Sequence, residues 1–258
     1  MPLLKSGKTE KNLMTAKNNN YRVQIKSQLK KDAASFCTFR KEEQMDYLFD
    51  ALAKQISEND LVLDACCGYG RFVHFLIKRF PKISLHGVDY VEELIQLAKE
   101  NFKNQSNVTF ECKDIFTIAN DYPKHFDYSI CYKTIYVLPD YKEIIKVLFS
   151  VTKKKVYITC PFYDGNLEFL SKINLSPQES RAENFAILNI YSYPQFEKFC
   201  LSSGAKSVKS WEMSISHPLN KSNPDTMHTY TEEIVDGKYI EINGIFLLNW
   251  KLVEINLE

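Results

Sequence analysis

Short hydrophobic runs alternate with stretches of helical periodicity over most of the chain after residue 42. In 42–57, apolar side chains recur at i, i+3, i+4 and i+7, which predicts an amphipathic helix. Further helical patterns occur at 70–80, 91–103 and near 140–150, and strand-like apolar runs at 61–63, 83–88, 108–112, 126–132 and 156–160. Strands that alternate with helices favour parallel pairing, with helices on both faces of the sheet. The pattern therefore predicts an α/β fold with a doubly wound, mostly parallel sheet.

The second half of the chain departs from this alternation. Residues 162–192 have no clear period and are rich in Ser, Asn, Gln and Glu, so we interpret them as an insertion above the sheet. A helix is predicted over 193–205 and a sixth strand over 207–215. Within 228–254, Asp236-Gly237 separates two β-rich runs, which is a signal for a type I′ hairpin. A terminal antiparallel strand would bring the sheet to seven strands.

Composition and charge narrow the class of protein. The chain has 258 residues and a formal net charge of +1, with 33 Lys and Arg against 32 Asp and Glu, so no strong overall field favours nucleic acid. The first 31 residues hold eight Lys and Arg and one acid, Glu10, without a sustained apolar run. This excludes a signal peptide or membrane span there. We expect a basic tail and helical lid over 1–41, a single domain over 42–258, and a cytoplasmic protein.

The cysteines are scattered without a CxxC pair or a nearby histidine at metal-ligand spacing. Several of the seven lie inside apolar runs, so we interpret them as small core residues in a reducing compartment. We expect neither disulfides nor a metal site from Cys37, Cys66, Cys67, Cys112, Cys131, Cys160 and Cys200.

Candidate chemistry begins with the loop Asp64-Ala65-Cys66-Cys67-Gly68-Tyr69-Gly70, directly after the first predicted strand. Glycine allows a tight turn and close ligand approach, and the following helix offers free N–H groups. Asp89 ends the second strand, where a carboxylate can hold ribose hydroxyls. A nicotinamide-dinucleotide site would explain these features equally well. However, Val73 occupies the place of the third glycine of that fingerprint, and an acid at Asp64 would oppose a phosphate.

Four segments together resemble the class I S-adenosylmethionine (SAM)-dependent methyltransferases. Residues 62–70 are similar to the first motif of this family, 87–99 to the second motif and its helix, 108–115 to the third-strand motif and 126–130 to the fourth. The resemblance covers about residues 45–160, in consistent order and spacing. SAM carries a sulfonium and an ammonium and has no pyrophosphate, which suits an acid at the start of the loop.

The resemblance implies a cofactor site along the ends of the first strands. Asp64 would order the loop and the methionine end of SAM, and the backbone at Ala65, Gly68 and Gly70 would face the cofactor. Asp89 would bind the ribose.

The same resemblance implies contacts to the adenine and to the methionine end. Tyr90 would lie on one adenine face, Asp114 would accept a hydrogen bond from the adenine amine, and Ile115 would cover the ring. Cys131 or Tyr132 would lie near the methionine ammonium. S-adenosylhomocysteine (SAH) would be the product.

Two further points concern the edges of this site. Cys66 stands where the family usually has glycine, which puts the width of the cofactor pocket in doubt. Arg40 just before the domain, or Arg22 or Thr38, could bind the SAM carboxylate from the lid.

The acceptor is expected at the carboxyl ends of the later strands, where ligands bind in open α/β sheets. His217 and His228 follow the sixth strand and are candidate general bases by position and intrinsic pKa. Lys133, after the fourth strand, could bind an anionic group of the acceptor. Residues 162–192 and 216–243 are expected to roof the site, which favours a small molecule.

The same strand ends bear on other possible functions. Cys131-Tyr132-Lys133-Thr134 does not match the Asn/Asp-Pro-Pro-Tyr/Phe of nucleic-acid amino-methylating enzymes. Cys160 resembles the Thr-Cys of cytosine-5 RNA methyltransferases, but the accompanying Pro-Cys is missing. We therefore predict methyl transfer to an O or N atom of a small polar acceptor, such as a sugar, surface-glycan precursor or metabolite. The alternatives are a nucleic-acid methyltransferase, an NAD(P)-dependent oxidoreductase and a non-catalytic SAM-binding protein.

Overall fold

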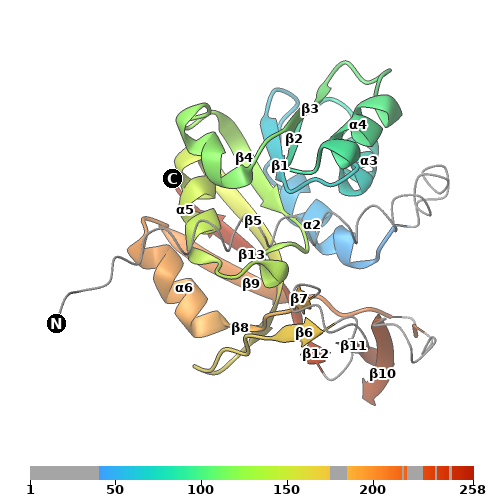
Figure 1. Cartoon of the computed structure of the whole chain (residues 1–258), viewed down its shortest axis with the longest axis vertical. Coiled ribbons are helices and arrows are strands. Elements are labelled where there is room, and N and C mark those ends of the chain that lie inside the picture. Colours follow the sequence, from blue (N-terminus) through green and yellow to red (C-terminus); the bar gives the residue numbers. More distant parts are fainter. Residues whose placement is uncertain (1–40, 175–184, 217, 220–228, 236, 244–245) are drawn as a thin grey trace.

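The computed structural model describes residues 41–174, 185–216, 218–219, 229–235, 237–243 and 246–258. Figure 1 shows a central twisted sheet with helices on both faces and smaller sheets at one end. The predicted lid residues Arg22, Thr38 and Arg40 lie outside the described residues, as do the candidate bases His217 and His228.

The central sheet has the strand order β3-β2-β1-β4-β5-β13-β9, with the short β8 paired to the end of β5. The first five strands of this order pair in parallel, whereas β13 is antiparallel to both of its neighbours. This confirms the predicted mostly parallel sheet with a terminal antiparallel strand. The strands are β1 (Leu61–Ala65), β2 (Ser84–Asp89), β3 (Val108–Cys112), β4 (Phe126–Cys131), β5 (Thr152–Tyr163), β8 (Tyr191–Ser192), β9 (Ser207–Glu212) and β13 (Trp250–Asn256).

Helices cover the two faces of this sheet and produce two separate cores. One core contains the apolar faces of α2 (Gln44–Ala53), α3 (Arg71–Arg79) and α4 (Glu92–Asn101). The other contains those of α5 (Lys142–Val151) and α6 (Tyr193–Ser202), together with the 3₁₀ turns η2 (Ile115–Asn120) and η3 (Ile135–Val137). The buried side chains recur at helical spacing, which is why the sequence pattern located these helices.

The segment interpreted from the sequence as an insertion above the sheet contains a pair of short strands. Strands β6 (Lys172–Asn174) and β7 (Phe185–Ile187) pair antiparallel within 162–192. Strands of three residues are too short to show an alternation of apolar and polar positions, so the residue pattern did not predict these two strands.

The predicted hairpin near residue 236 is confirmed. Strand β10 (Thr229–Val235) pairs antiparallel with β11 (Lys238–Asn243), which in turn pairs with β12 (Phe246–Leu248). Val235 lies opposite Lys238, so two residues form the turn. Gly237 has φ +73°, the conformation that a type I′ turn requires; Asp236 lies outside the described residues.

The three-stranded sheet β10–β12 belongs to an excursion that starts and ends at the carboxyl end of the parallel strands. Trp250, the first residue of β13, pairs with Pro161 near the end of β5, and Lys251 pairs with Glu212 at the end of β9. The chain between β9 and β13 therefore leaves the central sheet and returns to it at this edge, below the labels β5 and β13 in Figure 1.

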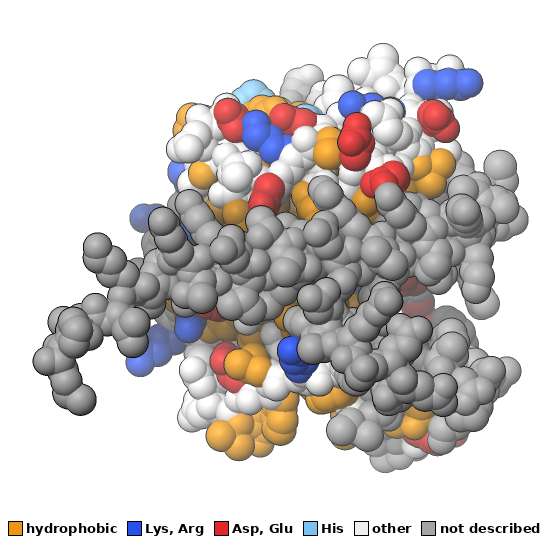
Figure 2. All heavy atoms as spheres, in the orientation of Figure 1, with side chains coloured by type: hydrophobic (Ala, Val, Ile, Leu, Met, Phe, Trp, Pro, Cys, Tyr) orange, Lys and Arg blue, Asp and Glu red, His pale blue; other side chains and the backbone are white. Residues whose placement is uncertain are grey.

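Acidic and basic side chains are interspersed on the face shown in Figure 2, in keeping with the net charge of +1. None of the helices in the described part of the chain combines the length and the apolar character needed to cross a membrane.

Candidate functional site

The loop between β1 and α3 makes a tight turn with three residues in the left-handed region. Cys66 has φ +64°, Gly68 +56° and Gly70 +83°. Glycine adopts these angles without penalty, whereas a residue with a Cβ loses about 1–2 kcal/mol there. The family usually has a glycine at the position of Cys66. This chain keeps the left-handed backbone angle at that position, although the residue is a cysteine.

Two glycines are also needed for packing. A Cβ on Gly70 would lie 2.7 Å from Cε2 of Phe102, and a Cβ on Gly87 would lie 2.6 Å from Cδ1 of Phe110. The two rings contact each other, with centroids 5.2 Å apart. The aromatic pair therefore packs directly beneath the loop because both backbone positions lack side chains.

Asp64 and Asp89 lie at the carboxyl ends of neighbouring strands β1 and β2. Asp89 accepts hydrogen bonds from the backbone N–H groups of Gly68 and Val91, each 3.0 Å long, and so connects the loop to the end of β2. Asp64 is 2% exposed, and its Oδ2 has no hydrogen-bond partner among the described residues. Burial, reinforced by the nearby Asp89, raises the pKa of Asp64 well above its ordinary value.

A buried carboxylate without a partner is costly, and a cation placed beside it would remove that cost. The loop therefore fits a ligand that carries a positive charge close to the carboxylate of Asp64. A ribose could use the remaining acceptor capacity of Asp89, whose two bonds to backbone leave lone pairs free.

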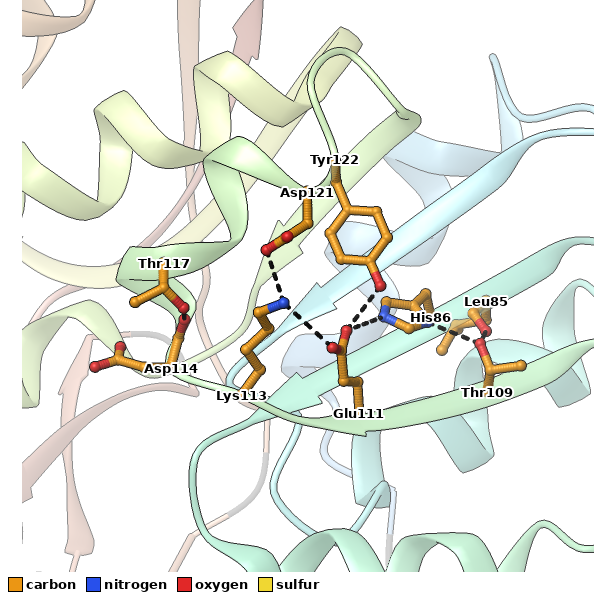
Figure 3. Close-up of polar contacts among 9 residues, drawn as sticks. All are labelled: Leu85, His86, Thr109, Glu111, Lys113, Asp114, Thr117, Asp121 and Tyr122. Carbon is orange, nitrogen blue, oxygen red and sulfur yellow. Dashed lines mark hydrogen bonds and ion pairs between the residues drawn. The ribbon is translucent and has the colours of Figure 1, made fainter.

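The residues predicted for the adenine follow the ends of two strands, Tyr90 after β2 and Asp114 and Ile115 after β3. Asp114 caps η2, accepting a 3.0 Å hydrogen bond from the Phe116 N–H, and Figure 3 shows its carboxyl group pointing away from the Lys113–Asp121 ion pair. Ile115 is 5% exposed and belongs to the core cluster that also contains the ends of β1 and β2. Tyr90 is partly exposed. These residues lie at the same edge of the sheet as Asp64 and Asp89, as parallel pairing requires.

The end of β4 adjoins the loop. Cys131 is buried, and its thiol contacts the thiol of Cys66. Tyr132 stacks on Phe72 with ring centroids 4.9 Å apart, and its hydroxyl donates a 2.9 Å hydrogen bond to Oε2 of Glu42. Burial and the Glu42 carboxylate raise the pKa of Tyr132 well above its ordinary value, so this hydroxyl remains a donor at neutral pH.

Glu42 forms the centre of an ion cluster that sequence reasoning did not identify. Its Oε1 lies 2.6 Å from Nη1 of Arg71, and its Oε2 lies 2.9 Å from Nζ of Lys133. Burial opposes its ionisation, but Lys133 and Arg71 outweigh burial and lower the pKa of Glu42 to about 2. The three residues come from the start of α2, the start of α3 and the turn after β4, so no sequence motif connects them.

Lys133 occupies a constrained position in this cluster. It has φ +49°, and its N–H donates a 2.6 Å hydrogen bond to Oγ1 of Thr159 on β5. Its ammonium lies 4.6 Å from the centroid of the Trp250 ring as well as beside Glu42. The sequence suggested that Lys133 binds an anionic acceptor; in the structure its ammonium already has an internal carboxylate partner.

Trp250 also contacts residues of the smaller elements. Its ring packs edge-on against Tyr136 of η3, with centroids 5.2 Å apart. The Glu241 carboxyl on β11 is 7% exposed and faces Trp250, Lys133 and Gln44. Sequence reasoning missed Glu241, because a single acid in a β-rich run gives no signal of its burial.

A second polar cluster lies on the outer strands β2 and β3, shown in Figure 3. Glu111 accepts a 2.8 Å hydrogen bond from the Tyr122 hydroxyl and lies 3.4 Å from Nε2 of His86. Nζ of Lys113 lies 2.7 Å from Oδ2 of Asp121 and 3.4 Å from Oε1 of Glu111. Burial lowers the pKa of His86, although Glu111 opposes this effect. These side chains satisfy one another, which distinguishes them from the unpartnered Asp64.

Comparison with known proteins places the chain in a family. Residues 56–213, more than half of the chain, match a family model described as a methyltransferase domain. The chain is 32% identical over 104 residues to a malonyl-[acyl-carrier protein] O-methyltransferase of Bacillus anthracis. That match covers 40% of this chain and only 38% of the relative's length. The chain belongs to this methyltransferase-domain family.

Solved structures share the fold at low sequence identity. The 1,6-didemethyltoxoflavin-N1-methyltransferase of Burkholderia thailandensis, crystallised with its acceptor and SAH, aligns over 100% of this chain and 92% of its own with TM-score 0.60 and 13% identity. The magnesium protoporphyrin IX methyltransferase of Synechocystis with bound SAM aligns over 92% of this chain and 97% of its own, with TM-score 0.57 and 13% identity. These similarities confirm the predicted Rossmann-like methyltransferase fold.

Proposed function

We propose that this protein is a SAM-dependent methyltransferase that transfers the methyl group to an O or N atom of a small polar acceptor, and that it works in the cytoplasm. One observation carries the cofactor assignment: Oδ2 of the buried Asp64, at the start of the glycine loop, has no hydrogen-bond partner within the residues that the structure describes. A cationic ligand satisfies this oxygen, whereas the pyrophosphate of NAD(P) would be repelled by it. Bound SAM would supply an already activated methyl group.

The residues of the chain then bind and orient the cofactor. Asp64 would hold the methionine end, Asp89 the ribose, and the backbone at Ala65, Cys66, Gly68 and Gly70 would line the pocket. Residues from the next strands and from the lid would complete it: Tyr90, Asp114, Ile115, Cys131, Tyr132 and Arg40.

The acceptor assignment rests on the elements at the carboxyl edge of the sheet. The excursion that holds β10–β12 leaves the sheet at that edge, and the start of α2 is attached to it. Such a roof favours a small molecule over a polymer. The described side chains on the face shown in Figure 2 include both acidic and basic groups, whereas nucleic-acid binding favours a field of one sign. A sugar, surface-glycan precursor or metabolite is compatible with this setting. His217 and His228 remain candidate bases, and Lys133 a candidate acceptor contact.

Calorimetric titration of the purified protein with SAM, SAH and NAD(P) tests the cofactor assignment. We expect SAM and SAH to bind and to raise the melting temperature, with NAD(P) inactive in both measurements. Stabilisation by NAD(P) alone would contradict the proposal. Turnover with radiolabelled SAM across hydroxyl and amine acceptors tests the reaction class, and the single variants His217→Gln and His228→Gln test the candidate bases.

A further inference from the structure

The strand order of the central sheet reverses between β1 and β4. From β1 the chain runs outward through β2 to β3, then returns to β4 and continues on the other side through β5. The segments after β1 and β4 diverge, because α3 belongs to one core, whereas η3 and α5 belong to the other. In open α/β sheets, ligands bind at the carboxyl ends of the strands at such a switch in strand order. The predicted cofactor residues Gly70 and Cys131 lie on its two sides.

The side chain of Glu42 connects the two sides of this switch. Its Oε1 lies 2.6 Å from Nη1 of Arg71, the first residue of α3. Its Oε2 lies 2.9 Å from Nζ of Lys133 and accepts a 2.9 Å hydrogen bond from the Tyr132 hydroxyl. Tyr132 and Lys133 are the first two residues after β4. One carboxylate therefore holds the segment that follows the cofactor loop and the segment that follows β4.

Glu42 is itself attached to a packed helix. Its backbone carbonyl accepts a 3.0 Å hydrogen bond from the N–H of Met45, in the first turn of α2. The apolar face of α2 lies in the same core as α3, where the ring centroids of Phe49 and Phe72 are 5.8 Å apart. Phe72 in turn stacks on the Tyr132 ring. The carboxylate of Glu42 consequently has a defined place opposite both segments.

We propose that Glu42 is a positioning residue for the methyl donor, which fixes the segments after β1 and β4 at the spacing that binds the cofactor; this rests on the proposed function. Glu42 acts through Arg71, which places the start of α3, and through Tyr132, whose ring is held between Glu42 and Phe72. A site that is already in its binding geometry loses less conformational freedom when the ligand binds, so its affinity is higher.

Two other roles for Glu42 lead to different results. An acid that only stabilises the fold would leave ligand affinity unchanged in any variant that stays folded. An acid that acts on the ligand through its charge would be replaced by aspartate without loss, because the charge stays in place. A positioning residue needs both the charge and the reach of the side chain, since the carboxylate must contact two segments at once.

Calorimetric titration of the full chain with SAH tests the positioning role. The Glu42→Asp variant keeps the charge, but its carboxylate is withdrawn by one methylene and no longer reaches both segments. We expect the dissociation constant of SAH to rise by about 10–100-fold. The Glu42→Gln variant, which keeps the reach and loses the charge, should show a loss in the same direction. Circular dichroism identifies the conditions under which each variant is folded.

The matched control is Asp60→Asn, which removes an acid with similar contacts at the opposite edge of the sheet. Asp60 is 5% exposed, lies 2.6 Å from Nζ of Lys154 and accepts a 2.6 Å hydrogen bond from the N–H of Ser57. It directly precedes β1 and so lies at the amino end of the strand, away from the cofactor loop. Asp60→Asn should lower the free energy of unfolding, while the dissociation constant of SAH stays at the wild-type value.

The outcomes separate the positioning role from the proposed function. Absence of SAH binding to the wild type would contradict the proposed function itself. With wild-type binding intact, wild-type affinity in Glu42→Asp, or an equal loss of affinity in Asp60→Asn, would overturn the positioning role alone. If Glu42→Asp does not fold, Glu42→Gln replaces it: weaker SAH binding than in Asp60→Asn supports the role, and equal binding overturns it.

Discussion

The two halves of the carboxyl edge of the sheet differ in how an acid is held: Asp64 is buried and Glu42 is half-buried. In the half around β1 and β2, Asp64 is buried, and its Oδ2 has no hydrogen-bond partner in the described part of the chain. In the half beyond β4, Glu42 is held by Arg71 and Lys133 and ionises readily. The first arrangement costs stability until a cationic ligand binds, and the second stabilises the folded chain by itself. The contrast indicates which acids hold the structure together and which await a ligand.

Removal of the Glu42 charge should have the largest effect on folding. Glu42→Gln leaves two cations close together without their carboxylate, and we expect the free energy of unfolding to fall by about 3 kcal/mol, as measured by urea denaturation. The control is Glu58→Gln, because the Glu58–Lys82 ion pair is more than two-thirds exposed and should contribute under about 1 kcal/mol. Equal effects of the two substitutions would remove the distinction between the two kinds of pair.

The contribution of Glu42 should depend on pH in a defined direction. Its pKa is about 2 in the folded protein against the ordinary value of 4.5, so the folded state favours the ionised form. The stabilisation is therefore fully present above pH 4.5 and is lost as the pH falls from 4.5 towards 2. The difference in unfolding free energy between wild type and Glu42→Gln should shrink over this range. A constant difference would contradict the assignment.

Asp64 should respond with the opposite sign. Its folded-state pKa is raised by burial and by Asp89, so ionisation disfavours the folded state as pH rises above the ordinary value of 3.8. Asp64→Asn should leave the ligand-free protein equally or more stable at neutral pH, while SAM affinity falls by about 10–100-fold. Thermal unfolding and calorimetric titration measure the two effects on one sample. A loss of stability without a loss of affinity would show that Asp64 is structural.

Gly70 should be less tolerant of a side chain than a glycine in open space. Gly70→Ala combines φ +83° with a Cβ 2.7 Å from Phe102, and we expect a loss of about 2 kcal/mol. Gly204→Ala, at φ +111° with no atom within 4 Å of its Cβ, should lose only the conformational part, about 1 kcal/mol. Denaturation curves of both variants test whether packing under the cofactor loop adds to backbone strain.

The predictability of the two halves follows from how far apart their residues lie in the chain. Asp64, Asp89 and Asp114 lie at or just after the ends of three successive strands, β1, β2 and β3. The strand pattern and parallel pairing were therefore sufficient to predict that the three acids lie at one edge of the sheet. The roles predicted for these three residues remain predictions. The hairpin at Gly237 was also predictable, because a two-residue type I′ turn has strong residue preferences.

Other features gave no local signal. The hairpin of β6 and β7 has strands too short to show a period. Glu42 lies in the first turn of a predicted helix, where an acid is ordinary, and nothing in its neighbours indicates that Lys133 will approach it. In the sequence Glu241 is a single acid within a β-rich run, which does not indicate that it is buried. Its burial depends on the pairing of β11 with β12 and of β13 with β5.

By itself the sequence determined the layered α/β fold and the glycine turn of the loop Asp64–Gly70, because periodicity and turn preferences are properties of neighbouring residues. Its motifs also carried the resemblance to the methyltransferase family. Tertiary structure decided that Glu42 pairs with Arg71 and Lys133. It also decided that Oδ2 of Asp64 has no hydrogen-bond partner among the described residues, and that Glu241 faces Trp250. Burial and pairing between distant segments set the energy of a charge, and both exist only after the sheet has formed.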